Sequence, residues 1–186
     1  MIKTKMMIRE FTDIGNVAGL WIAQGREMLV SANFLSQNSW FNMPFEKKSK
    51  VFEEDIWKYK HHNTSLMLKA MALECYLKGA LISKGKKLFK DGKLDSSFNK
   101  HCLIDFYDML NLQRNENEKR ILKYLEHWIY SGRYPISNKY NSIDGLPKHP
   151  NDKTPGRVIG LSWASPNDNQ TFNGIIEKVM ELINSE

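Results

Sequence analysis

The sequence predicts an all-α fold, a single domain of 186 residues arranged as a bundle of five helices. Apolar residues recur at helical spacing in five segments, and no segment alternates convincingly between apolar and polar residues as a strand does. Five of the six prolines lie beyond residue 134, so the chain before them can hold long helices. We expect a bundle core over about residues 16–135, a long proline-containing loop over 136–169 and a C-terminal helix over 170–184.

The first helix is expected over residues 16–35, although Gly19 and Gly25 weaken it. Its apolar face is broad and consists of Val17, Leu20, Trp21, Met28, Val30, Ala32 and Leu35. Residues 36–60 are predicted to form a loop around Pro44, followed by a short helical entry.

The second helix, over residues 63–83, is the clearest in the sequence. Asn63 is a plausible N-cap, and Gly85 follows the helix at the position where a left-handed glycine often ends one. Apolar residues surround the helix almost completely, which is typical of a buried element. We therefore expect it to be the central helix of the bundle.

Three further helices complete the pattern. The third is expected over residues 99–112, the fourth over 116–131 with Gly132 as its stop, and the last over 170–184. The stretch 134–170 is rich in turn-forming pairs such as Asp-Gly and Pro-Gly, so we expect a long surface loop that is either functional or mobile.

Composition and charge exclude several classes of protein. No apolar run is long enough to span a membrane, and the first ten residues lack the apolar core of a signal peptide, so we expect a cytoplasmic protein with no membrane partner. Cys75 and Cys102 are expected to be reduced thiols in the core. The histidines show no metal-ligand spacing and no glycine-rich phosphate loop opens a helix, so we expect no metal and no cofactor.

The net charge of +6 is unevenly distributed. Between residues 78 and 100, seven lysines face only Asp91 and Asp95, a local charge of +5. The lysines are Lys78, Lys84, Lys86, Lys87, Lys90, Lys93 and Lys100. Such a cluster can contact phosphates, or it can be an ordinary solvated lysine loop.

Arg120 and His127 are the candidate catalytic pair. Seven residues make nearly two helical turns, so both project from one face of the fourth helix, with Tyr124 between them. An imidazole can act as general acid or base and a guanidinium can stabilise a charged phosphorane, which together would support metal-independent RNA cleavage. The alternative is a surface arginine and a histidine that packs beside Trp128.

Three short stretches resemble the HEPN (higher eukaryotes and prokaryotes nucleotide-binding) domains. They are the segment from Ala72 to Leu81, the segment His101-Cys102-Leu103, and Gly132-Arg133-Tyr134-Pro135. The resemblance implies an up-and-down bundle of four to five helices that often dimerises. Many members are RNases of toxin–antitoxin, abortive-infection or CRISPR systems, and others are non-catalytic companions of nucleotidyltransferases.

The resemblance also implies roles for individual residues. Active members carry an Arg, four to six residues, and then a His, and Arg120 and His127 fit this spacing, with Ile121 in place of the usual polar residue after the arginine. Glu74 and Lys78 can line a polar cleft or simply pair with each other.

Three more residues have two interpretations each. His101 can cap the third helix or contact a partner, and it belongs to the same proposed polar cleft as Glu74. Arg133 and Tyr134 can bind a phosphate and stack on a base, or they can anchor the long loop.

We therefore expect a nucleotide- or RNA-binding protein of a bacterial defence or toxin–antitoxin type, a homodimer that can pair with a nucleotidyltransferase-type protein. The expected nucleic-acid contacts are Lys78, Lys84, Lys86, Lys87, Arg133 and Tyr134. The alternatives are a metal-independent endoribonuclease that uses Arg120 and His127, and a non-catalytic assembly module.

Overall fold

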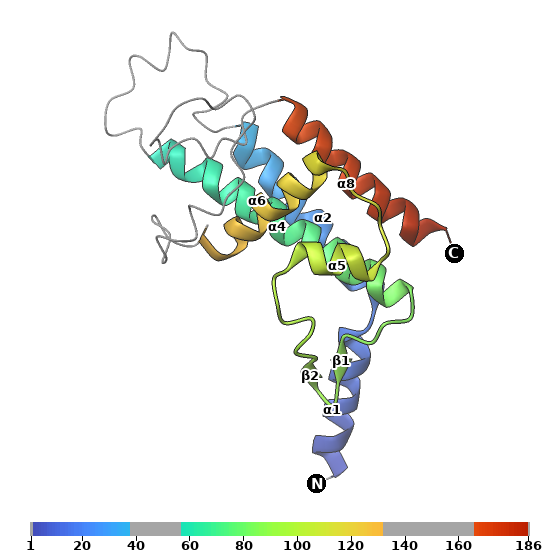
Figure 1. Cartoon of the computed structure of the whole chain (residues 1–186). Coiled ribbons are helices and arrows are strands. Elements are labelled where there is room, and N and C mark those ends of the chain that lie inside the picture. The colour runs from blue at the N-terminus through green and yellow to red at the C-terminus, as the bar shows by residue number, and fades with distance from the viewer. Residues whose placement is uncertain (1, 38–56, 132–165, 186) are drawn as a thin grey trace.

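The computed structural model describes residues 2–37, 57–131 and 166–185. Helices make up most of these segments, which confirms the all-α class (Figure 1). Arg133, Tyr134, most of the expected loop over 136–169 and most of the stretch 36–60 lie outside the described residues. The elements are α1 (Ile2–Gly15), α2 (Ala18–Gln37), α4 (Trp57–Ser83), β1 (Phe89–Lys90), β2 (Lys93–Leu94), α5 (Leu103–Met109), α6 (Glu116–Ser131) and α8 (Pro166–Asn184).

Helix α4 is the central element, as its sequence predicts. It packs against α2, α5, α6 and α8, and every residue from 72 to 81 is buried. The helix begins at Trp57, so Asn63 lies inside it and is not its N-cap. Its end is as expected: Gly85 has a φ of +79°, and the amide of Lys86 donates to the carbonyl of Leu81 at 2.9 Å, which closes a Schellman motif.

Helix α2 lies along α4, and two glycines allow the close approach. A Cβ on Gly25 would lie 3.0 Å from the carbonyl oxygen of Ala72, and one on Gly79 would lie 2.8 Å from a carbon of Ile22. Gly25 therefore lowers the intrinsic helix propensity of α2, but a larger residue would not fit where α2 meets α4. The Ser65 hydroxyl also donates to the carbonyl of Ala32 at 2.7 Å across this contact.

The expectation that the chain contains no sheet is wrong for residues 89–94. Strands β1 and β2 form an antiparallel hairpin in which Phe89 lies opposite Leu94 and Lys90 opposite Lys93. The two turn residues, Asp91 and Gly92, both have positive φ values, 51° and 76°. Asp-Gly is a strong signal for a two-residue hairpin turn, but strands of two residues are too short to show alternation.

The boundaries of the other helices differ in part from the predictions. Helix α6 matches its predicted range, whereas α5 is shorter than the predicted 99–112 at both ends. It begins at Leu103, after the extended N-cap residue Cys102, and ends at Met109, just before the backbone turns at Asn111, which has a φ of 55°. Helix α8 starts four residues earlier than expected, at Pro166, since a proline is well tolerated at the first position of a helix. No described helix is long and apolar enough to cross a membrane.

Helix α1 was not expected. It extends from one end of the bundle beside the hairpin (Figure 1). Asn16, just after the helix, holds the two together: its side-chain oxygen accepts hydrogen bonds from the amides of Leu88 at 2.7 Å and Phe89 at 2.9 Å, and its nitrogen donates to the Phe89 carbonyl at 2.9 Å. We call α1 and the hairpin residues 88–95 the arm.

Candidate functional site

Three of the predicted site residues form a cluster of charged and polar groups. The Lys78 ammonium donates to Oε1 of Glu74 at 2.6 Å, and His101 Nδ1 donates to Oε2 of the same carboxylate at 2.8 Å. Glu74 and Lys78 are one turn apart on α4, while His101 lies 27 residues further along the chain, just before α5. The structure thus shows the pairing of Glu74 with Lys78 and adds the histidine to it.

The Glu74–Lys78 pair is buried in the core. The side chains of Glu74 and Lys78 are only 9% and 5% exposed, and that of His101 is 35% exposed. The Lys78 ammonium also lies 5.2 Å from the ring centre of Trp21 and 5.5 Å from that of Phe106, so two aromatic rings compensate part of its lost hydration. Lys78 therefore lies inside the bundle, away from the exposed lysines that follow it in the sequence.

His101 does not cap α5. The N-cap residue is Cys102, which makes no side-chain capping hydrogen bond. The cap comes from another helix: Oε1 of Glu126, on α6, accepts a hydrogen bond from the amide of Ile104 at 2.8 Å. Burial raises the pKa of Glu126, and its hydrogen bonds with backbone amides oppose that shift.

The Arg120–His127 pair lies on α6 as predicted, and each residue has its own contacts. Arg120 Nη2 donates to Oδ1 of Asp168, an almost fully buried carboxylate on α8. The His127 ring packs edge-on against Trp128, with ring centres 5.6 Å apart, and burial lowers the pKa of His127. His127 is therefore neutral near pH 7. The charge of Arg120 is compensated by the carboxylate of Asp168, a partner that the sequence did not predict.

Two further polar contacts hold α8 on the bundle. Lys178 on α8 donates to Oε1 of Glu118 on α6 at 2.5 Å. The other carboxylate oxygen of Glu118 accepts from the backbone amide of Asn115, and the Asn115 side chain accepts from the amide of Glu118, which forms a capping box at the start of α6. Lys69 on α4 donates to Oδ1 of Asn169 at 2.9 Å, and burial lowers the pKa of Lys69 to about 8. These contacts join α8 to α4 and α6. Of these interactions, only the capping box could have been predicted from the sequence, by the three-residue spacing of Asn115 and Glu118.

The lysines that follow α4 lie on the surface. All six side chains are exposed, and they occupy the segment from the end of α4 through the hairpin to the start of α5. They are Lys84, Lys86, Lys87, Lys90, Lys93 and Lys100. The backbone that carries them is ordered by the Schellman motif, by the fully buried Leu88 and by the contacts of Asn16.

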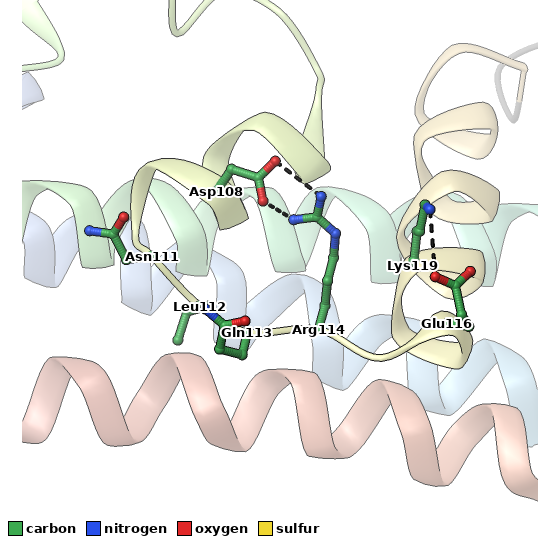
Figure 2. Close-up of a pocket in the computed structure, with 7 residues that line it drawn as sticks. All are labelled: Asp108, Asn111, Leu112, Gln113, Arg114, Glu116 and Lys119. Atoms are coloured by element: carbon green, nitrogen blue, oxygen red, sulfur yellow. Dashed lines mark hydrogen bonds and ion pairs between the residues drawn. The ribbon is translucent and has the colours of Figure 1, made fainter.

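A polar pocket of about 470 Å³ opens between the end of α5 and the start of α6 (Figure 2). Asp108 and Arg114 point toward each other in an ion pair, and Lys119 lies 3.6 Å from Glu116. The two cations and two anions cancel, so the pocket has no net charge to attract a phosphate. It contains no residue that the sequence singled out.

Other reactive groups offer little chemistry. Burial raises the pKa values of Cys75 and Cys102 to about 11, so both thiols stay protonated near neutral pH and are poor nucleophiles. Within the described segments, no group of three or more His, Cys, Asp or Glu side chains is placed to hold a metal ion.

Comparison with known proteins gives no matching family model, no matching curated protein and no matching solved structure. The function of the chain is therefore inferred from its own residues.

Proposed function

We propose that the chain binds RNA or a nucleotide through the exposed lysines between residues 84 and 100. The single observation that supports this proposal is the six exposed lysines held on an ordered backbone. Only Asp91 and Asp95 offset them within the segment, so its net charge is +4. A cationic surface of this kind attracts phosphates and releases the counterions condensed on a nucleic acid.

The ordered backbone of the lysine segment supports this proposal. The Schellman motif fixes the turn after α4, and Asn16 satisfies both the amide and the carbonyl of Phe89. Backbone fixed in this way presents the lysines in one arrangement, which lowers the entropic cost of binding.

We further place the chain among HEPN-type proteins of bacterial defence or toxin–antitoxin systems. The helical bundle is compatible with that assignment, and two of the stretches that resemble the family, 72–81 and 101–103, supply the Glu74–Lys78–His101 cluster. A nucleotidyltransferase-type partner remains part of this proposal. Self-association as a homodimer is supported by the outward face of α2, where Leu20 and Val30 are 52% and 65% exposed.

The test is RNA affinity as a function of salt concentration. Binding should weaken as salt rises, and neutralising Lys84, Lys86 and Lys87 to Gln should reduce the log–log salt slope by about 0.7 to 0.9 for each lysine that contacts a phosphate. The control is Lys119→Gln with Lys123→Gln, which removes two charges from α6, compared with three in the test variant, and should leave the slope unchanged. Affinity independent of salt, or equal losses in both variants, would count against the lysine surface.

Cleavage of RNA by Arg120 and His127 is the second candidate function. The observation in its favour is that Arg120 Nε makes no hydrogen bond to the described residues, so it would donate to a phosphate once the groups that bury it move aside. The ion pair with Asp168 favours a structural role for the same side chain. Cleavage in EDTA that is lost in both Arg120→Ala and His127→Ala would establish the enzyme, provided that both variants keep the helical circular-dichroism spectrum.

A further inference from the structure

The two parts of the arm are far apart in the sequence but are joined by hydrogen bonds and packing. Besides the contacts of Asn16, the Thr12 hydroxyl accepts a hydrogen bond from the amide of Gly92 at 2.8 Å. Gly15 leaves the space that the Phe89 ring fills, since a Cβ there would lie 2.6 Å from that ring. The faces of α1 and of the hairpin are thus held in a defined relation to each other.

Phe11 lies on this unit with an exposed ring. Its side chain is 56% exposed, and its ring meets that of Phe89 edge-on, with centres 5.6 Å apart and planes at 75°. Met7 and Ile14, one turn away on either side, are 61% and 58% exposed. An aromatic ring supported at its edge and surrounded by exposed apolar side chains is suited to stack on another flat apolar group.

The hairpin places two like charges directly opposite each other. Lys90 and Lys93 are cross-strand partners, and both side chains are exposed. Like charges in this position destabilise a hairpin. A phosphate between the two ammonium groups would remove that repulsion.

We propose that the arm binds single-stranded RNA, with a base stacked on Phe11 and the neighbouring phosphates held by Lys90 and Lys93. An apolar strip alone would also suit a protein partner, but the lysine pair on the adjoining hairpin is complementary to a polyanion. Unpaired bases present the flat faces that a duplex hides, so the combination favours a single strand. This inference rests on the proposed function and names its nucleic-acid class and the residue that stacks.

The first part of the test measures binding of a 12-nucleotide single strand and of a duplex of the same length. The wild type should prefer the single strand. Phe11→Leu, which keeps apolar bulk but loses the ring, should weaken single-strand binding at least about fivefold, and Phe11→Tyr should retain it. Equal loss in the Leu and Tyr variants would overturn the stacking role.

The second part tests the lysine pair. Lys90→Gln with Lys93→Gln should reduce the salt slope for the single strand by about 1.4, which is the expected effect of two lost phosphate contacts. The double variant Lys119→Gln with Lys123→Gln removes the same charge elsewhere and should not change the slope. An unchanged slope in the hairpin variant would overturn the proposal.

The two proposals fail in different ways. If neutralising Lys84, Lys86 and Lys87 weakens binding but the Phe11 and hairpin variants bind like the wild type, the arm proposal is wrong and the lysine surface stands. If the wild type binds a nucleotide but no RNA, only the arm proposal is wrong, and if it binds neither, both are wrong. The oligomeric state of the Phe11 variants, measured by sedimentation, distinguishes a further case. If these variants lose self-association but keep the RNA affinity of the wild type, the arm binds another copy of the protein and not RNA.

Discussion

The bundle and the arm use the same kinds of side chain in opposite ways. In the bundle, charged groups are buried and matched, as in the contacts of Glu74 with Lys78 and of Arg120 with Asp168. On the arm and the adjoining turn of α2, apolar groups are exposed: seven of the ten large hydrophobic side chains that are exposed in the described segments lie between residues 6 and 20. The buried charges hold helices together, whereas the exposed apolar and basic groups remain available to a partner.

The largest expected effect comes from breaking the buried charge cluster. Glu74→Ala leaves the Lys78 ammonium buried without its carboxylate and also removes the partner of His101. We expect a loss of about 3–5 kcal/mol in the free energy of unfolding, measured by urea denaturation. Glu116→Ala is the control, because its exposed ion pair with Lys119 should contribute less than about 1 kcal/mol. Similar losses in the two variants would mean that the burial of Glu74 has no energetic consequence.

A smaller effect is expected where the arm joins the bundle. Asn16→Ala leaves the amides of Leu88 and Phe89 without their acceptor, which should cost about 1–3 kcal/mol. The loss should be local, so hydrogen exchange at these two amides should accelerate more than exchange within α4. The exposed Asn33→Ala on α2 serves as the control. Uniform acceleration along the whole chain would show that the arm is part of the same cooperative unit as the bundle.

The pH dependence of stability provides a third comparison. Burial lowers the pKa of Lys69 from 10.5 to about 8, so the folded protein binds this proton less tightly than the unfolded chain. Unfolding therefore takes up a proton above pH 8, and this group makes stability rise with pH there. Between pH 8 and 9 the wild type should gain about 1 kcal/mol relative to Lys69→Met, measured by denaturation at each pH.

The raised pKa values of Cys75 and Cys102 act in the opposite direction as the pH approaches 9, since the unfolded thiols lose their protons first. Both proteins contain these thiols, so their contribution cancels in the comparison of the wild type with Lys69→Met. If the free energies of unfolding of the wild type and of Lys69→Met change with pH in the same way between pH 8 and 9, burial does not lower the pKa of Lys69.

The smallest expected change is a gain in stability on the arm. Lys93→Glu replaces the repulsion with Lys90 by an attraction and should stabilise the protein by about 0.2–1 kcal/mol, measured by thermal unfolding. The same variant should bind RNA more weakly. A gain in stability together with unchanged RNA affinity would mean that the paired lysines have no role in binding.

The sequence by itself determined the elements whose signals are local. Helix α6 could be predicted because its apolar residues recur every three or four positions. Helix α4 could be predicted because apolar residues surround it almost completely over a long stretch, and Gly85 marks its end by its backbone freedom. The pairing of Glu74 with Lys78 could also be anticipated, since the two residues are one turn apart. The hairpin left a local signal as well, the Asp-Gly turn.

Tertiary structure decided which distant residues meet. His101 reaches Glu74 across 27 residues, Arg120 reaches Asp168 across 48, and Asn16 reaches Phe89 across 73. A charged side chain has many possible partners of opposite sign along the chain, and only the packing of helices selects one of them. The arm depends on the same selection: Phe11 is one apolar residue of an amphipathic helix until the hairpin, which also carries the Lys90–Lys93 pair, places Phe89 against its ring.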